Sequence, residues 1–466
     1  MKRFNIYIIG ALLWLHASLG FAQSGDIAAE KWKWQSASSQ TAAIPKDNQW
    51  WKVFNDSTLD SLIELGLANN LDLKAIMSRL DEARTRVKVA QSYYLPSVRL
   101  SPYVATQNLA PNRPVAIQLQ DGQQLSRFTL NTYQIPLDVS YELDIWQRIG
   151  KQVQVNQLLA QATEAEQQTV RLIVTSEIAR IYLLLRTTDT EKFVLERSMK
   201  LRDSTLAVVQ ERFKAGLITQ MDVQRAETEV ANIRVQLQGI QRSRTELELS
   251  IGVLTGVPSA SIFINEAPLP ENLPVVPVTT PAQVLLRRPD LLQSERLVEA
   301  ANEQIKINKT ALRPRLSLVG SAGLISQEPG NLLSANSATY LLGASVSVPI
   351  YEGNRNRNNV LIAQHQAQAI SATYQQRVLT AGREIETALA NLQILSEQIN
   401  SQQQALESAR RTRLYAHELY VKGLTTFLEV VDAERTTLEL ERQAVNLKGQ
   451  QAIYTISLIK AIGGSW

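Results

Sequence analysis

The sequence predicts a mainly α-helical, internally duplicated protein in which each copy joins two β-strands to a long helical hairpin. No proline falls between Pro136 and Pro258 or after Pro349, so two long stretches lack the strongest helix breaker. After Pro96 and after Pro314 the hydrophobic residues instead alternate with a period of 2, which is typical of strands. Residue matches at a constant spacing predict the duplication.

The composition argues against an enzyme. The 466 residues are 44% hydrophobic and 20% charged, which suits a packed fold. Lys and Arg number 48 against 44 Asp and Glu, and a net charge of +4 is too small to predict a nucleic-acid partner. The chain has no cysteine and only three histidines, His16, His365 and His417, which excludes thiolate sites and imidazole clusters. We therefore expect no catalytic residues, no metal site and no cofactor.

Residues 1–22 have the pattern of a secretory signal peptide. Lys2 and Arg3 precede an apolar stretch from Ile6 to Leu15, and small residues at positions 20 and 22 predict cleavage after Ala22. The stretch is well short of the ~20 apolar residues that a membrane-spanning helix needs. No longer apolar run follows, so crossing a membrane would require strands closed into a barrel.

Six further segments follow the signal peptide. We expect an N-terminal tail with the first helices, two strands, a long helical hairpin, a linker with a helix, two more strands and a second hairpin. Their expected bounds, in that order, are 23–95, 96–145, 146–257, 258–313, 314–350 and 351–466. Each hairpin turns at a glycine, Gly216 or Gly423, that suits the left-handed position after a helix end. Apolar residues spaced by 3 and 4 predict a coiled-coil seam in the second hairpin: Ile385, Ala388, Leu392, Leu395 and Ile399.

The two halves of the chain match residue by residue. At an offset of 207, Gly216-Leu217 matches Gly423-Leu424 and Asp222 matches Glu429. At an offset of 218, Pro96 matches Pro314. This period far exceeds the roughly 20 to 50 residues of solenoid repeats, so each half is expected to be a structural copy of the other.

The alternating segments predict strands with one apolar and one polar face. The apolar faces carry Tyr133, Ile135, Leu137, Val139, Tyr141 and Leu143 in the second segment, and Tyr340, Leu342, Ala344, Val346 and Val348 in the fourth. On the opposite faces we expect Asn131, Gln134, Asp138 and Ser140, and Ser345 and Ser347. Because the smallest membrane barrels have ~8 strands, four strands per chain predict a 12-stranded barrel shared by three protomers.

Short motifs along the chain form a recognisable set. They are Trp50-Trp51-Lys52-Val53-Phe54, Ala68-Asn69-Asn70-Leu71-Asp72-Leu73, Tyr94-Leu95-Pro96, Tyr141-Glu142-Leu143-Asp144-Ile145-Trp146 and Leu285-Leu286-Arg287-Arg288-Pro289-Asp290-Leu291. The set resembles TolC-like outer-membrane efflux proteins. Within this outer membrane factor family, it is most similar to the NodT-type subgroup that serves resistance-nodulation-division pumps.

The resemblance implies an architecture and a function. It implies a homotrimer embedded in outer-membrane lipids, with a shared 12-stranded barrel and a periplasmic α-barrel tunnel made of the long helices. The implied partners are a periplasmic adaptor (membrane fusion) protein and an inner-membrane pump, and the implied function is passive efflux of small molecules, as in antibiotic resistance. Many members of the subgroup carry an acylated cysteine, but this chain has no cysteine, so we expect no lipid anchor.

The resemblance also implies a pore constriction near the hairpin tips. Glu429 and Asp432 are three residues apart on one helix face, so a trimer would present six carboxylates around its axis. They match the acidic ring that constricts the pore in the family. The alternative interpretation is an ordinary solvated helix face. The tips themselves, Gly216, Leu217, Gly423 and Leu424, are implied to form the inner mouth and to contact the adaptor.

Three further residues match gate positions of the family. Tyr420 and Asp222 stand where relatives make the hydrogen bonds and ion pairs that hold the mouth shut. Thr425 stands where some relatives have an arginine, so we expect that salt bridge to be absent here. Lys422 and Arg225 are the candidates to replace it.

Two other functions stay open from the residues alone. The chain could be a periplasmic coiled-coil adaptor or scaffold, or an outer membrane factor that secretes polypeptides. The alternating segments favour the channel, because an adaptor has no use for them. Two possible sites are better explained by structure. We expect Asp290 to cap a helix start, with Pro289 marking the boundary, and the tryptophans Trp32, Trp34, Trp50 and Trp51 to pack in the core.

Overall fold

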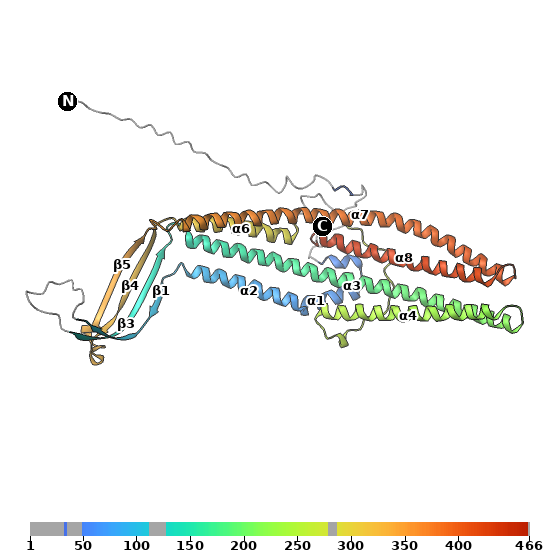
Figure 1. Cartoon of the computed structure of the whole chain (residues 1–466), viewed down its shortest axis with the longest axis horizontal. Coiled ribbons are helices and arrows are strands. Elements are labelled where there is room, and N and C mark those ends of the chain that lie inside the picture. Colours follow the sequence, from blue (N-terminus) through green and yellow to red (C-terminus); the bar gives the residue numbers. More distant parts are fainter. Residues whose placement is uncertain (1–31, 35–48, 111–126, 278–286, 465–466) are drawn as a thin grey trace, which may run out of the picture.

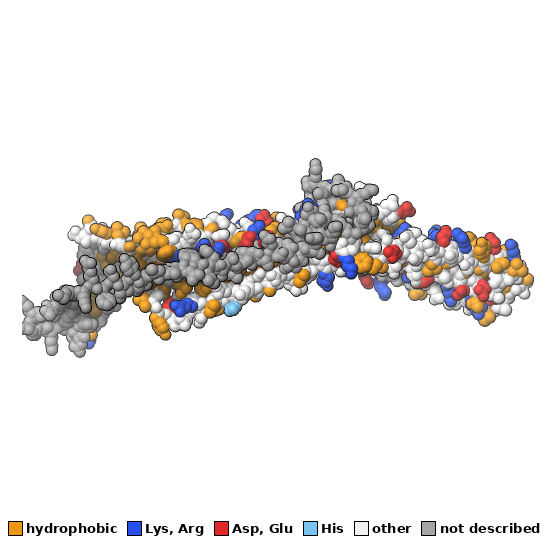
Figure 2. All heavy atoms as spheres, turned by 90° about the horizontal axis from the view of Figure 1, so that it is seen from above, with side chains coloured by type: hydrophobic (Ala, Val, Ile, Leu, Met, Phe, Trp, Pro, Cys, Tyr) orange, Lys and Arg blue, Asp and Glu red, His pale blue; other side chains and the backbone are white. Residues whose placement is uncertain are grey.

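The computed structural model describes residues 32–34, 49–110, 127–277 and 287–464, and these form an elongated molecule (Figure 1). The strands lie at one end and the two helical hairpin tips at the other, with the C-terminal residues near the middle of the long axis. The predicted signal peptide, residues 1–22, lies outside the described residues. Hydrophobic side chains gather on the surface toward the strand end, whereas charged side chains are interspersed along the helices (Figure 2).

Seven α-helices make up most of the described chain. They are α1 (Ser57–Asn69), α2 (Leu71–Ser92), α3 (Arg148–Lys214), α4 (Gln220–Thr255), α6 (Pro289–Thr310), α7 (Arg355–Val421) and α8 (Phe427–Ala461), together with the short 3-10 helix η2 (Trp50–Phe54). Three further 3-10 turns are η3 (Ser259–Ser261), η4 (Pro329–Asn331) and η5 (Ala335–Ser337). None of the helices in the described part of the chain is long and apolar enough to cross a membrane.

The helices confirm the predicted duplication. Helices α3 and α7 have 67 residues each, and α7 begins and ends 207 residues after α3 (355 − 148 and 421 − 214). Helices α2 and α6 have 22 residues each, and their starts differ by 218 (289 − 71). At 1.5 Å per residue, α3 and α7 are each about 100 Å long. The two halves therefore repeat the lengths of the helices as well as the sequence motifs.

The helices pack side by side in two halves. Toward the strands, α2 contacts α3, α3 contacts α6, and α6 contacts α7. Toward the tips, α4 pairs with α3 and α8 pairs with α7, while α8 also contacts α3. Each long helix thus runs through both halves, and the α3–α8 contact joins the two hairpins within one chain (Figure 1).

The strands form one antiparallel sheet. They are β1 (Ser97–Leu100), β2 (Tyr103–Leu109), β3 (Phe128–Leu143), β4 (Arg315–Ser326) and β5 (Ala338–Ser347). The order is β1-β3-β4-β5, with β2 also paired to β3. The first predicted strand is therefore interrupted between Leu100 and Tyr103. The gap holds Pro102, which lacks an N–H and lies opposite the β3 segment that contains Pro136, so the ladder loses donors from both sides.

The register of the sheet separates an apolar from a polar face. Leu342 of β5 lies opposite Gly320 of β4, and Gly320 lies opposite Val139 of β3, so the predicted apolar residues share one face. On the other face, the hydroxyls of Ser97 and Ser140 lie 2.7 Å apart. The prediction that Asn131 lies on this polar face was wrong.

Asn131 lies on the same face as Tyr133, because residues two apart on a strand point the same way. Its side chain pairs with the Thr106 hydroxyl of β2 at 3.0 Å. Asn131 thus lies near the start of β3, on a face that is otherwise apolar.

Three of the four predicted tryptophans lie in the main hydrophobic core. Trp32, Trp50 and Trp51 are buried with residues of α1, α3 and α8, and Trp34 is half-buried. The predicted helix start at Pro289 is confirmed, but Asp290 is not its cap, because Asp290 lies within the first turn and no side chain caps the helix. Asp290 accepts the Leu291 N–H at 3.0 Å in the first turn of α6 and pairs with Arg288, which donates to the Ala461 carbonyl at 2.8 Å. Arg288 itself occupies the N-cap position.

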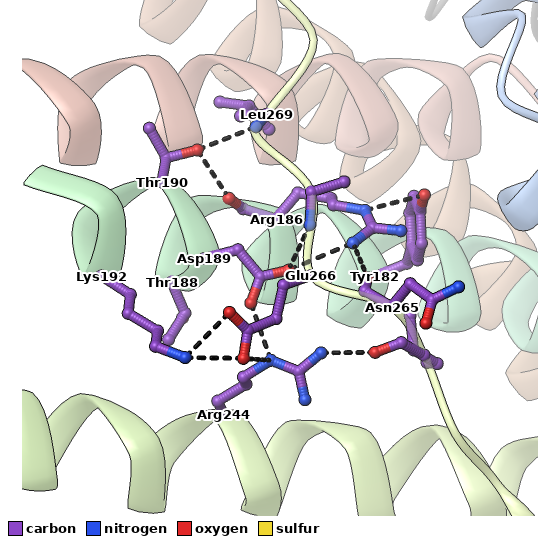
Figure 3. Close-up of polar contacts among 12 residues, drawn as sticks. Tyr182, Arg186, Thr188, Asp189, Thr190, Lys192, Arg244, Asn265, Glu266 and Leu269 are labelled. Atoms are coloured by element: carbon purple, nitrogen blue, oxygen red, sulfur yellow. Dashed lines mark hydrogen bonds and ion pairs between the residues drawn. The ribbon is translucent and has the colours of Figure 1, made fainter. Parts of the chain in front are cut away.

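A buried polar network fastens the linker after α4 to the helices (Figure 3). Asp189 of α3 has no exposed surface and accepts from Arg244 Nε of α4 at 2.8 Å and from Arg186 Nη1 at 3.1 Å. The two arginines also donate to linker carbonyls, Arg186 to Asn265 at 2.6 Å and Arg244 to Ile264 at 2.5 Å. Arg244 also pairs with Glu248 at 2.9 Å, so Asp189 bridges two buried guanidinium groups that hold the linker in place.

Candidate functional site

Both hairpin tips have the same hydrogen-bonded turn. At the first, Leu217 N–H donates to Arg212 O at 3.0 Å and Gly216 N–H to Phe213 O at 2.9 Å. At the second, the N–H groups of Leu424 and Gly423 donate to Leu419 O and Tyr420 O at 2.9 and 3.0 Å. Each glycine has φ near +73°, a left-handed conformation that a Cβ disfavours. This explains why glycine stands at both tips, at the end of the molecule farthest from the strands (Figure 1).

A threonine begins the helix that follows the first tip. Thr219 is the extended N-cap residue of α4, and its hydroxyl lies 3.1 Å from Asp222 Oδ2. Asp222 also forms an ion pair with Arg225 at 3.6 Å, one turn along the same helix. The predicted gate residue Asp222 thus contacts residues at the start of α4. Its ion-pair partner is Arg225, which was a candidate to replace the missing gate arginine.

The two predicted constriction carboxylates lie in the corresponding helix of the second hairpin. Glu429 and Asp432 are exposed in the first two turns of α8, while the intervening Val430 and Val431 are buried. Among the residues that the structure describes, neither carboxylate makes a hydrogen bond or an ion pair. They therefore present two free negative charges on one side of the hairpin, beside the tip at Gly423.

Tyr420 is buried between the two hairpins. It packs with residues of α3, α4 and α8 in a small hydrophobic cluster: Val209, Val223, Ala226, Phe427, Val430 and Val431. Its ring centroid lies 5.6 Å from that of Phe427, and its hydroxyl is buried without a hydrogen-bond partner among the described residues. The Tyr420 hydroxyl and Asp222 consequently make no hydrogen bond within this chain. Thr425 is half-buried in the turn, between Gly423 and the N-cap residue Thr426.

Arg212 is a residue of this site that the sequence analysis missed. It lies in the last turn of α3, and its guanidinium donates to the carbonyls of Tyr420 at 3.1 Å and Val421 at 2.9 Å, at the end of α7. Its Cζ lies 4.6 Å from the centre of the Tyr420 ring. A basic residue near a helix end is usually explained by its own helix dipole, so no sequence pattern predicts that Arg212 contacts the other hairpin.

A buried ion-pair cluster joins the hairpins farther from the tips. Arg202 of α3 and Glu229 of α4 are both about 95% buried and pair with each other, and Arg435 Nε of α8 donates to the same carboxylate at 2.9 Å. Nearby, burial raises the pKa of Glu434, which is held by Thr205 at 3.4 Å. Burial also lowers the pKa of Arg202. The helical periodicity of the sequence could not show that these charged side chains are buried and not exposed to solvent.

The sequence family model for the outer membrane efflux protein matches residues 62–257 and 280–464. This match covers both repeats. The chain belongs to the outer membrane efflux protein family.

Curated relatives of this efflux protein match over nearly their whole length. The pyoverdine export outer membrane protein OpmQ of Pseudomonas aeruginosa is 28% identical over 472 residues, covering 100% of this chain and 98% of the relative. The toluene efflux pump outer membrane protein TtgI of Pseudomonas putida is 28% identical over 437 residues, covering 92% and 89%. The cation efflux system protein CusC of Escherichia coli is 26% identical over 430 residues, covering 91% and 90%.

Solved structures share the fold of this efflux protein. The outer-membrane channel OprN superposes with a TM-score of 0.85 at 24% identity, covering 94% of this chain and 96% of OprN. The outer membrane protein VceC of Vibrio cholerae gives a TM-score of 0.81 at 24% identity, covering 90% and 99%. The predicted fold class and the resemblance to outer-membrane efflux proteins are confirmed. The family is one of efflux channels, so the alternative of a periplasmic adaptor or scaffold is not favoured.

Proposed function

We propose that this efflux protein is the outer-membrane channel of a tripartite efflux system, a passive conduit that docks to a periplasmic adaptor and an inner-membrane pump. One observation carries the proposal: a sheet with two open edges is joined to helices of about 100 Å, which suits a pore continued by a long tunnel. The described residues hold no group of acidic or histidine side chains that could bind a metal ion. The protein is proposed to work without chemistry of its own.

Three chains are proposed to close the barrel. In the described chain, β1 and β2 form one edge of the sheet and β5 the other, and unpaired edges expose backbone groups that must be satisfied in a membrane. Three chains with four strand positions each would supply 12 strands, within the range of outer-membrane barrels. The apolar face that contains Leu342 would then face lipid, and the face that contains Asp138 would face the lumen.

The exported compounds are proposed to be small molecules. The relatives named above export pyoverdine, toluene and cations by their names, so the fold is compatible with chemically different cargoes. One relative, SilC of Salmonella typhimurium, is described as a probable lipoprotein. The 466 residues of this chain contain no cysteine that could carry such an anchor, so we propose that it is held in the membrane by its strands alone.

The tips are proposed to form the inner mouth, with Glu429 and Asp432 as its selective constriction. Both carboxylates are exposed and make no hydrogen bond or ion pair with the residues that the structure describes. In a trimer they would form a ring of six carboxylates, and rings of acidic side chains favour cations in pores. Leu217 and Leu424, exposed at the two tips, are the proposed adaptor contacts.

Replacing both carboxylates, as Glu429→Gln with Asp432→Asn, is expected to abolish cation preference in planar-bilayer recordings of the purified protein. Block by multivalent cations should weaken as well, because the ring that attracts them is gone. The thermal midpoint of unfolding should stay unchanged, since exposed carboxylates contribute little to stability.

The matched control replaces two exposed carboxylates of α7 away from the tip, as Glu397→Gln with Glu407→Gln. This control should keep the cation preference of the unmodified protein. A purified protein that never conducts would refute the proposed function. Unchanged selectivity in the Glu429/Asp432 variant would instead show that these carboxylates are only a solvated helix face.

A further inference from the structure

We propose that Arg212 latches the two hairpin tips of each protomer together and so sets the width of the inner mouth. The inference rests on the proposed channel function. Arg212 lies in the first hairpin, and its guanidinium spans the last two residues of α7 in the second, donating to Tyr420 O at 3.1 Å and to Val421 O at 2.9 Å. The same residue therefore takes part in both tips, because its own carbonyl accepts the Leu217 N–H of the first turn.

The contact has the chemistry of a strong and specific connection. The last carbonyls of a helix have no partner within the helix, and they lie at the negative end of the helix dipole. Tyr420 O already accepts the Gly423 N–H, and the guanidinium group adds a second donor to it and one to Val421 O. A planar pair of donors can bond both carbonyls at once, which an ammonium group cannot reproduce. The Arg212 Cζ also lies 4.6 Å from the centre of the Tyr420 ring, a cation–π arrangement. The ring is 5% exposed, so the contact is buried on its Tyr420 side, whereas the bond to Val421 lies at the surface.

The duplication shows that this connection is made only once per protomer. The residue that matches Arg212 at the offset of 207 is Leu419, which cannot donate a hydrogen bond. In a ring of alternating hairpins, the seam between neighbouring protomers would place Leu419 where the seam within a protomer has Arg212. The latch is therefore absent from the seams between protomers.

The buried ion pairs have the same asymmetry. Arg202, Glu229 and Arg435 join α3, α4 and α8 within the protomer. Their matches at the offset of 207 are Ala409, Thr436 and Thr228, none of which is charged. Two independent contacts thus hold the hairpins of one protomer together, and neither can recur between protomers. Of these two contacts, Arg212 lies nearer the mouth.

The decisive experiment compares Arg212→Leu, which installs the residue of the second repeat, with the unmodified protein in single-channel recordings. Losing the latch should free the second tip, so conductance should rise several-fold and open periods should lengthen. Cation preference should not change, because Glu429 and Asp432 stay in place. Arg212→Lys should give an intermediate conductance, since an ammonium keeps the charge without the paired donors. Lys214→Leu is the matched control, because Lys214 is exposed and its one ion pair among the described residues is with Glu211 of its own helix.

Hydrogen–deuterium exchange of the Arg212→Lys protein provides a second test. It needs neither channel recordings nor the Arg212→Leu variant, which removes the charge altogether. Backbone amides of residues 416–424 should exchange faster than in the unmodified protein, while amides around Asp189 should not change. Unaltered conductance in a folded Arg212→Leu protein, or unaltered exchange at the second tip, would overturn the latch. If the unmodified protein conducts and either of these results is found, only the latch is refuted. The proposed channel function then still holds.

Discussion

Replacing Asp189 with alanine is expected to lower the free energy of unfolding by about 3 to 5 kcal/mol, the usual cost of leaving buried charges without a partner. Asp189 is fully buried and receives the guanidinium groups of Arg186 and Arg244, whose side chains are 4% and 5% exposed. It also accepts the backbone N–H of Ala267 at 3.2 Å. Its loss would leave the buried Arg186 without a carboxylate, would leave Arg244 with Glu248 alone, and would remove the bond that ties Ala267 of the linker to α3 (Figure 3).

The measurement is thermal unfolding of the purified protein in detergent, followed by circular dichroism. Glu177→Ala is the matched control, because Glu177 pairs with Arg180 of the same helix and both side chains are more than one-third exposed. Such a pair contributes about 1 kcal/mol or less, so the control should unfold close to the unmodified protein. Equal unfolding midpoints for the Asp189 and Glu177 variants would contradict the structural role assigned to the buried network.

Replacing Leu342 with arginine is expected to impair assembly, with a cost of roughly 2 to 4 kcal/mol if the residue lies near the bilayer midplane. Leu342 lies in the middle of β5 on the face that we propose to contact lipid, opposite Gly320 of β4. A charge there would have to enter hydrocarbon. The yield of folded, heat-modifiable protein in outer-membrane fractions measures the effect.

Leu341→Arg is the matched control for this variant. Leu341 is the adjacent residue of the same type, and it lies on the opposite face, across from Ser321. An arginine in a polar lumen should be tolerated, so Leu341→Arg should assemble nearly as well as the unmodified protein. If the two variants lose the same amount of folded protein, the proposed assignment of faces to lipid and lumen is wrong.

Most of the fold could be predicted because it depends on patterns that are local or repeated. The absence of proline over two long stretches predicted helices that the structure ends at Lys214 and Val421, next to the predicted turns at Gly216 and Gly423. The matches at offsets of 207 and 218 predicted equal helix pairs. The strand interruption was missed, because it arises from two prolines, Pro102 and Pro136, that meet only once the strands pair.

The site could be predicted only as far as the turns. The glycine in each tip is required by a local left-handed conformation, so its position was readable from one chain segment. The contacts of Arg212 and Arg202 depend on which helices become neighbours, and a periodic pattern does not reveal that. For the same reason, the burial of Tyr420 and the pairing of Asp222 with Arg225 emerged only from the structure.

The mass of the purified protein in mild detergent tests the central claim most directly. The account holds that the sheet of one chain is part of a barrel that only neighbouring chains can close. Native mass measurement should therefore find three chains per particle, stable without cross-linking, with no folded single chain. A stable, folded monomer would contradict the account, because the edges formed by β1, β2 and β5 would then be satisfied without partners.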